Sequence, residues 1–221
     1  MKDVFGLIYT SDESDMRLRD LTRSRSIAAM PIGGRYRVID VLLSNLVHSG
    51  VSNVGLITQR NYHSLMDHLE SGKAWDLNRK RDGLFILPPY VTRSSTGSYS
   101  GLLDAIRSNL NYVRRASQRY ALISGSSTVF NMKFDDMMAQ HLATGADITI
   151  LYNVPADDES NGDADRTHLK MDESGRVVDI EVTPHLNTYP NVSMDVYIMD
   201  KALLTYLVEV SAAHYRSDFV R

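Results

Sequence analysis

Charged residues near the amino terminus are the part of this sequence best suited to an anionic, phosphate-bearing ligand. Residues 17–37 contain six arginines, opposed only by Asp20. In a chain with a formal net charge of −3, such a locally basic segment favours an anionic ligand or effector, and a solvated arginine-rich loop is the alternative. Just upstream, Asp12, Glu13 and Asp15 follow the first expected strand, where a phosphate-binding loop would need glycines. This stretch therefore lacks a glycine-rich phosphate cradle.

Side chains that could hold a metal ion or act as nucleophiles are few. The expected strand that ends at Ile123 is followed by Ser126, whose neutral hydroxyl is a poor ligand for Mg²⁺. Asp135 and Asp136 come at the start of the next expected helix, where aspartates usually act as caps or as partners of the helix dipole. The histidines form no HxH or HExxH pattern, the acidic residues of 157–165 lack the spacing of a calcium loop, and the chain has no cysteine. Residue spacing thus predicts no metal site.

The elements that must position these residues alternate along the chain between short apolar runs and amphipathic segments. This alternation is typical of an α/β fold with a mostly parallel sheet that helices cover on both faces. We expect strands at Val4–Tyr9, Val54–Thr58, Leu84–Leu87, Tyr120–Ile123, Ile148–Val154, Thr167–Met171, Val177–Ile180 and Met194–Ile198. We expect helices at Tyr36–Ser49, Asn61–Leu69, Leu102–Val113, Phe134–Ala143 and Lys201–Ala212. In such sheets ligands bind beyond the carboxyl ends of the strands.

Composition narrows the class of protein further. With 221 residues, 43% hydrophobic and 23% charged, the chain is typical of a globular protein with one large or two small domains. No apolar run approaches the roughly 20 residues that a membrane span needs. The start, MKDVFGLIY, has no basic region, long apolar stretch or small-residue cleavage site, so a cytoplasmic location is expected. The slightly negative net charge argues against a nucleic-acid partner.

Three stretches carry a specific resemblance: RLRDLTRSRSIAAMPIGGRYRVIDVLLSNLVHSG, LITQRNYHSLMDHLESGKAWDLNRKRDGLFILPP and GLLDAIRSNLNYV. They resemble glucose-1-phosphate adenylyltransferases (ADP-glucose pyrophosphorylases), and the similarity covers nearly the whole chain. Members of that family make ADP-glucose and pyrophosphate from ATP and glucose 1-phosphate, with Mg²⁺, for glycogen or starch synthesis. The resemblance implies a Rossmann-like, GT-A-related nucleotidyltransferase domain, a three-layer sandwich, over residues 1–221. It also implies a C-terminal left-handed β-helix domain that this chain does not contain.

Part of the substrate pocket of that family is retained. Arg17 matches the arginine that ends the glycine-rich motif and faces the phosphates. Gln59 and Gly101 match positions at the adenine, and Asp104 lies in the stretch GLLDA, which corresponds to GTADA in the family. Ser193 matches a serine of the sugar-binding segment ASMGIY, which is VSMDVY here. The resemblance thus implies vestigial nucleotide-binding and sugar-phosphate positions.

The catalytic positions of the family are substituted. Ile27 replaces the lysine of the RAKP motif, and Ser126 replaces the metal-binding aspartate of the GDH motif. Val182 and Thr183 replace the glutamate and lysine that hold glucose 1-phosphate, and Asp195 replaces a glycine of the sugar loop, where its charge would repel a sugar phosphate. The loss of one preorganised charged contact typically costs about 3–4 kcal/mol of transition-state stabilisation. No catalytic residue and no cofactor are therefore predicted for this chain.

The resemblance implies a GlgD-type regulatory subunit, non-catalytic or weakly active, that forms a hetero-oligomer with a catalytic glucose-1-phosphate adenylyltransferase subunit. Such a subunit could still bind ATP, a sugar phosphate or an anionic effector, and Arg79, Lys80 and Arg81 are candidates for an interface or effector patch. Two alternatives stay open. One is an active nucleotidyltransferase whose Mg²⁺ is recruited by a displaced carboxylate such as Asp135 or Asp136, and the other is a stand-alone nucleotide or sugar-phosphate binding module.

Overall fold

The computed structural model describes residues 1–11, 15, 18–89, 91–92, 95–96, 99–155, 166–182 and 189–213. Its centre is an eight-stranded sheet in the order β11-β10-β12-β8-β1-β4-β5, with β9 also paired to β12. The strands are β1 (Val4–Tyr9), β4 (Asn53–Ile57), β5 (Gly83–Leu87), β8 (Tyr120–Gly125), β9 (Ile148–Asn153), β10 (Thr167–Met171), β11 (Val177–Val182) and β12 (Asn191–Asp200). All eight predicted strands are present, and the α/β fold class is confirmed.

The sheet has a parallel half and an antiparallel half. Strands β8, β1, β4 and β5 are parallel, and their continuous apolar runs are typical of strands buried on both faces. Strand β12 runs antiparallel to β8, β9 and β10, and β10 is antiparallel to β11. Short apolar runs in a sequence indicate that a strand forms, but they do not indicate its direction. The antiparallel half of the sheet was therefore not predicted.

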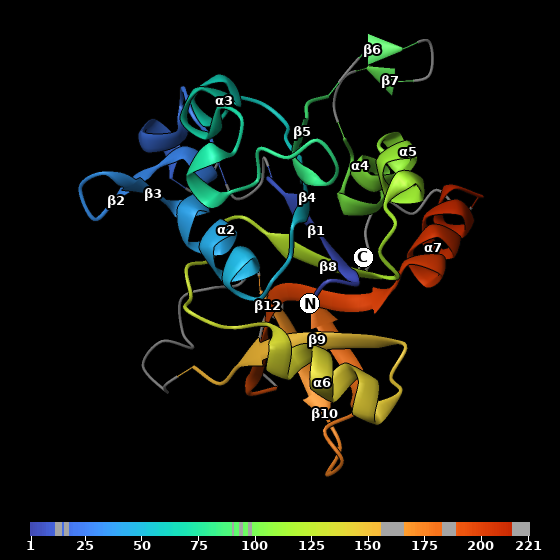
Figure 1. The fold of residues 1–221 in the computed structure, drawn as a ribbon. Helices are drawn as coiled ribbons and strands as arrows, with labels where there is room; N and C mark the ends of the chain where they lie inside the picture. The colour runs from blue at the N-terminus through green and yellow to red at the C-terminus, as the bar shows by residue number, and fades with distance from the viewer. Residues whose placement is uncertain are drawn as a thin grey trace.

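Helices form a layer on each side of the sheet, which makes the predicted three-layer sandwich (Figure 1). On one face lie α2 (Val38–His48), α3 (His63–Leu69) and α6 (Asp135–Thr144), which share a core with Val54 and Leu56. On the other lie α4 (Leu102–Ser108), α5 (Leu110–Arg115) and α7 (Lys201–Ala213), which share a second core with Phe5 and Ile57. No helix in the described ranges has the length and apolar character needed to cross a bilayer.

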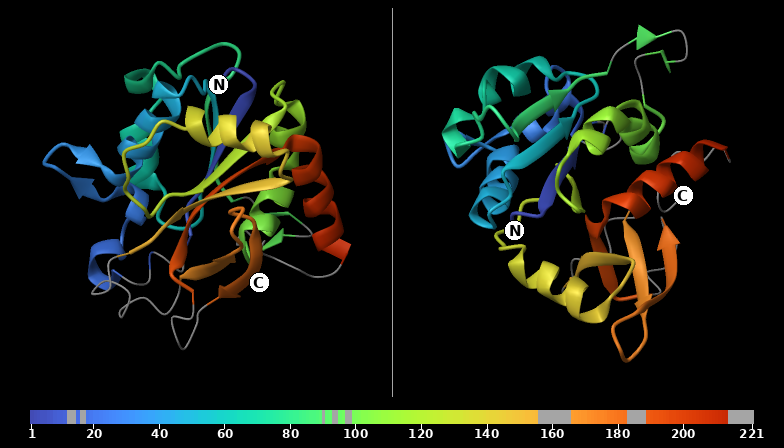
Figure 2. Two further views of the ribbon diagram at one scale, coloured as in Figure 1. Left: turned by 90° about the horizontal axis from the view of Figure 1, so that it is seen from below. Right: turned by 45° about the vertical axis from the view of Figure 1, so that its right-hand side comes forward.

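Two predicted helix boundaries are wrong for local reasons. The helix expected from Tyr36 begins at Val38, because β3 (Tyr36–Arg37) pairs with β2 (Pro31–Ile32) in a hairpin that stands out from the molecule (Figure 2). The helix expected over Leu102–Val113 is interrupted at Asn109, whose φ of −108° and ψ of 19° leave the helical region. Its side chain donates a hydrogen bond to the carbonyl of Ala105 (2.9 Å), a local bond that competes with helix continuation.

Short elements complete the chain. There are 3₁₀ turns η1 (Arg19–Thr22), η2 (Ile27–Ala29) and η3 (Lys73–Trp75), and a two-stranded ribbon of β6 (Val91–Thr92) and β7 (Ser95–Thr96). Trp75 packs against the first core, and its ring meets the ring of His68 edge-on at 6.0 Å. This contact fits the role of a packing aromatic. The acidic stretch at 157–165 lies outside the described residues.

Candidate functional site

The carboxyl ends of the parallel strands lie side by side, as the sequence predicts. Tyr9 at the end of β1 is paired with Gly125 on one side and with Ile57 on the other. Hydrogen bonds hold the segments that follow: Thr10 N donates to Ile57 O (3.1 Å), and Thr58 N donates to Leu87 O (3.1 Å). The residues after β1, β4 and β8 therefore share one edge of the sheet, which is where ligands bind in folds of this kind.

Gln59, predicted to lie at the adenine, forms a polar corner at this edge. Its side chain is buried, and Nε2 donates a hydrogen bond to the hydroxyl of Tyr9 (2.5 Å). Its backbone N–H donates to Oγ1 of Thr10 (3.2 Å). The side-chain amide is thus held in one orientation by its neighbours, an arrangement suited to reading the edge of a base.

Asp104, a further predicted nucleotide contact, is held by residues close to it in the chain. Its Oδ2 accepts a hydrogen bond from Ser100 N (3.0 Å), and its Oδ1 lies 2.6 Å from Arg107 Nη2. This carboxylate therefore ties the first turn of α4 to Ser100, the residue before Gly101. Arg17 lies outside the described residues, so its contact with phosphates stays a prediction.

Ile27, at the position of the family's lysine, is an apolar and buried side chain in η2, with 9% of its surface exposed. Its backbone N–H donates a hydrogen bond to Oδ1 of Asp15 (2.7 Å), and the hydroxyl of Thr22 donates to the carbonyl of Asp15. The carboxylate of Asp15 is thus turned onto the backbone of η2. Asp12 and Glu13, the other acidic residues of this loop, lie outside the described residues.

Asp195 in β12 lies close to Gly125, which ends β8 and directly precedes Ser126. Ser126 is buried just after β8, and the pairing of β12 is interrupted between Ser193 and Val196. Within this bulge Asp195 has a left-handed φ of 55°, and a β-carbon placed on Gly125 would lie 3.6 Å from Asp195 Cβ. Asp195 N donates to Ser193 Oγ (3.2 Å), and the Tyr197 hydroxyl donates to Asp195 Oδ1 (3.3 Å). The negative charge of Asp195 therefore lies close to Gly125, one residue before the expected position of the metal ligand.

Of the two positions that hold glucose 1-phosphate in the family, Val182 and Thr183, only Val182 lies among the described residues. Val182 lies half-buried at the end of β11, paired with Thr167 of β10, and it offers no charged or hydrogen-bonding side chain. Thr183 lies outside the described residues. Ser193, the predicted sugar contact, is buried and accepts the hydrogen bond from Asp195 N.

The described residues at this edge of the sheet do not fit the Mg²⁺ that the family uses. Within the described ranges, no three histidine, aspartate or glutamate side chains gather into a possible metal site. Asp135 Oδ1 lies 3.9 Å from the amino group of Met1, and Met1 precedes the start of β1. Since β1 spans roughly 17 Å at about 3.3 Å per residue, Asp135 lies at the opposite end of the sheet from Ser126. Asp135 and its neighbour Asp136 are therefore not displaced metal ligands, and their position at the start of α6 fits a capping role.

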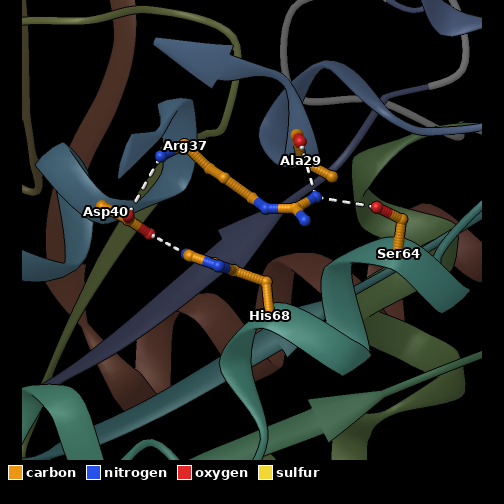
Figure 3. Close-up of polar contacts among 5 residues, drawn as sticks. All are labelled: Ala29, Arg37, Asp40, Ser64 and His68. Carbon is orange, nitrogen blue, oxygen red and sulfur yellow. Dashed lines mark hydrogen bonds and ion pairs between the residues drawn. The ribbon is translucent and has the colours of Figure 1, made fainter. Parts of the chain in front are cut away.

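A polar cluster that was not predicted from the sequence holds η2 against two helices (Figure 3). Asp40 accepts hydrogen bonds from Arg37 N at Oδ2 (3.0 Å) and pairs through Oδ1 with His68 Nε2 (2.6 Å). Arg37 Nη1 donates to Ala29 O (2.8 Å) and to Ser64 Oγ (2.7 Å). The guanidinium of Arg37, one of the arginines considered for an anion, is thus used to join η2, α2 and α3. The only signal in the sequence was the charged triplet within GGRYRVID, which also fits an exposed turn.

The mostly parallel central sheet with helices on both faces is the fold of a Rossmann-like nucleotidyltransferase domain. The chain belongs to the nucleotidyl transferase family, whose family model matches residues 14–220. Within that family it is similar to glucose-1-phosphate adenylyltransferases. It is 39% identical to the one from Thermomicrobium roseum over 206 residues, which are 92% of this chain and 47% of that protein.

Two further relatives agree. The chain is 35% identical to the glucose-1-phosphate adenylyltransferase of Bacillus mycoides over 91% of its own length and 53% of the relative. It is 34% identical to that of Bacillus cytotoxicus over 89% of its length and 51% of the relative. The resemblance inferred from the sequence is thereby confirmed at the level of the family. The chain spans about half the length of the curated relatives it matches.

Proposed function

We propose that this chain is the nucleotidyltransferase-like part of a regulatory subunit, non-catalytic or weakly active, that supports ADP-glucose synthesis by a catalytic glucose-1-phosphate adenylyltransferase. The observation that carries the proposal is the edge of the sheet around Ser126. The buried hydroxyl of Ser126 stands at the position of the family's metal-binding aspartate, and Asp195 lies close to the preceding residue, Gly125. Without that metal-binding aspartate, the site would hold Mg²⁺ less well and would neutralise less of the charge that develops on transferring phosphates.

Ile27 supports the same conclusion from the other side of the site. Its side chain is buried in η2, and the hydrogen bonds around Asp15, Arg37 and Ala29 hold that turn in place. The apolar residue is therefore built into the packing of the turn. An apolar side chain at this position supplies no positive charge for the phosphates, which supports the loss of the lysine's role.

The partner and the rest of the protein follow from the same proposal. A C-terminal left-handed β-helix domain would occupy the length that the relatives have beyond this chain, and the complete subunit would join a catalytic homologue in a hetero-oligomer located in the cytoplasm. Arg79, Lys80 and Arg81 remain candidates for the interface or for an anionic effector. Among them Arg79 is fixed by its ion pair with Asp76 (2.5 Å), and all three are exposed.

The buried polar corner at Gln59 favours a role in which the family's substrate pocket still binds a nucleotide. ATP or a sugar phosphate would then act as an effector. The stand-alone binding module is the competing function that this corner also supports. Co-purification separates the two, because a module without a partner stays monomeric when a catalytic homologue is present.

The deciding experiment measures pyrophosphate release from ATP, glucose 1-phosphate and Mg²⁺ by the complete protein, alone and mixed with a catalytic homologue. We expect no release by the protein alone and a changed rate in the mixture. Clear activity of the protein alone would overturn the proposal. An unchanged rate in the mixture, with no complex on size-exclusion chromatography, would favour the stand-alone module.

A further inference from the structure

A cavity of about 410 Å³ lies along the edge strand β5, where α4 meets α5. It is lined at one end by Asp82, just before β5, and it extends to Leu87 at the end of that strand. None of the residues predicted to contact nucleotide, sugar or metal lines it. Its volume is within the range of about 300–1,000 Å³ that is usual for small-molecule sites.

The cavity lies beside a close contact between β4 and α5. A β-carbon on Gly55 would lie 2.5 Å from the ring of Tyr112, so this ring rests directly on the backbone of the sheet. The Tyr112 hydroxyl donates to Asn53 Oδ1 (2.9 Å), which fixes the ring over β4. Helix α5 is thereby held over β4, and β5 is left partly uncovered, with Phe85 44% exposed.

The walls of the cavity are aromatic and its rim is polar. The rings of Phe85 and Tyr112 lie 5.4 Å apart with 54° between their planes, and Leu87 extends the apolar surface. Burial raises the pKa of Tyr112 well above its usual range, and the charge of Asp82 raises it further, so the phenol stays neutral. Flat apolar walls of this kind accept a planar ring.

Two charged side chains line the cavity, Arg115 and Asp82, and Asp82 already accepts a hydrogen bond from Gln118 Nε2 (3.2 Å). Arg115 is exposed and lines the cavity, and no ion pair forms with it among the described residues. Its neighbour Arg114 differs, since Arg114 Nη2 lies 2.7 Å from Glu209 Oε1. The side chain of Asn109 also lines the cavity and already donates to Ala105 O (2.9 Å) and Tyr99 Oη (3.3 Å). The guanidinium of Arg115 is thus the group that would meet an anion.

We propose that the cavity between β5 and α5 is a second ligand site, which binds a small organic anion that carries a flat ring. Phe85 and Tyr112 receive the ring, and Arg115 pairs with the anionic group. A ligand there contacts the break between α4 and α5 at Asn109. Because α4 begins beside the candidate nucleotide site at Gly101, the ligand touches the same helix that borders that site.

The test uses two fluorescent probes of similar shape, anilinonaphthalene sulfonate, which is an anion, and N-phenylnaphthylamine, which is neutral. Phe85→Ala removes a wall, and we expect it to weaken both probes by about 5- to 10-fold. Its control is Tyr206→Ala on α7, an exposed aromatic outside the cavity. Arg115→Gln should weaken the anionic probe about threefold and leave the neutral probe unchanged. Arg114→Gln is the matched control for that change.

Equal affinity of all variants for both probes would overturn the proposal, and so would a loss in the control variants of the same size. If Arg115→Gln weakens neither probe or both alike, the anionic half of the proposal is wrong. Should Phe85→Ala fail to fold, Asn111→Trp fills the hollow from an exposed position on α5 and should exclude both probes. The proposal does not depend on catalytic silence, so the pyrophosphate assay neither supports nor weakens it.

Discussion

At the scale of single residues, Asp195 carries a backbone conformation that suits glycine. Its φ of 55° lies within the bulge of β12, and the family resemblance places a glycine there. Left-handed φ costs a residue with a β-carbon about 1–2 kcal/mol, less for aspartate and asparagine, which bond locally. Asp195 does so through its N–H to Ser193 Oγ (3.2 Å). Aspartate can therefore occupy this bulge at a modest conformational cost, with its charge close to Gly125.

This reasoning predicts an order of stability at position 195. Asp195→Ala should be less stable than Asp195→Gly by about 1 kcal/mol, because alanine has the β-carbon strain without a polar side chain. Urea unfolding of the two variants measures the difference. An alanine variant as stable as the glycine variant would show that the bulge relaxes, and the left-handed conformation would then carry no strain.

The substitutions at the candidate site act as a set. We predict that Ile27→Lys combined with Ser126→Asp, made in the complete protein, restores no robust ADP-glucose synthesis. The two changes return a cation and a metal ligand, but the phosphate loop and the sugar clamp stay absent, and catalytic groups that act as a unit are not additive. The readout is ADP-glucose formed from ATP and glucose 1-phosphate with Mg²⁺. Substantial product would refute the prediction.

The candidate site was only partly predictable from sequence. Gln59 was placed through the family pattern, and the structure adds the hydrogen bond to Tyr9 (2.5 Å) that orients it. The approach of Asp195 to Gly125 was not predictable, because it depends on a bulge between strands that are far apart in the chain. The opposite placement of Asp135 also required the structure, since chain order does not say which end of a sheet a helix start reaches.

At the scale of elements, the polar cluster around Asp40 joins the turn at Ile27 to two helices. Asp40 caps α2 through Arg37 N (3.0 Å) and pairs with His68 on α3 (2.6 Å). Only part of this cluster could be predicted from neighbouring residues in the sequence. The cap lies three residues from its partner, whereas the pairing with His68 spans separate helices.

Removal of this carboxylate should destabilise the fold. Asp40→Ala loses a helix cap and leaves the ring of His68 without its partner, so we expect a loss of about 1–3 kcal/mol. Asp67→Ala is the matched control, because Asp67 is an exposed aspartate on α3, and it should change stability by less than about 0.5 kcal/mol. Urea unfolding gives both values. Equal effects would show that the cluster adds nothing beyond surface charge.

The contact between Gly55 and Tyr112 gives a second prediction at this scale. Gly55→Ala should destabilise the protein by about 1–3 kcal/mol, because its β-carbon would overlap the ring of Tyr112. In a Tyr112→Ala background the same change should cost much less. A double-mutant cycle by chemical unfolding measures this coupling. Absence of coupling would mean that the ring does not rest on the backbone of β4.

Elements with a strong local pattern were the predictable part of the fold. Strand β1 agrees with its predicted range to the residue, since Val4–Tyr9 is continuously apolar and buried. The break at Asn109 was not predicted, because the helical spacing of apolar residues continues through it. The side-chain hydrogen bond to Ala105 O that accompanies the break is known only from the structure. The hairpin before α2 was missed because two-residue strands have no periodicity to read.

At the scale of the whole molecule, the antiparallel half of the sheet is joined to α6 by a buried histidine. The Nδ1 atom of His141 lies 2.8 Å from Thr149 Oγ1 on β9, and its ring meets the ring of Tyr120 edge-on at 5.6 Å. Burial lowers the pKa of His141, partly offset by the negative charge of Asp200. The folded protein therefore holds this ring neutral at pH values at which the unfolded chain binds a proton.

Stability should consequently fall as the pH drops through the ordinary histidine pKa of about 6.5, because the unfolded state then binds more protons than the folded state. This decrease in stability continues until the pH falls below the lowered pKa of His141 in the folded state. His141→Gln keeps a polar partner for Thr149 without a titrating ring, so its thermal midpoint should fall less between about pH 7.5 and about pH 5.5, one unit either side of that pKa. His63→Gln, at an exposed position, should follow the wild-type curve. If His141→Gln instead loses as much stability as wild type over this interval, the buried ring is not a source of the pH dependence, and carboxylates or other histidines must account for it.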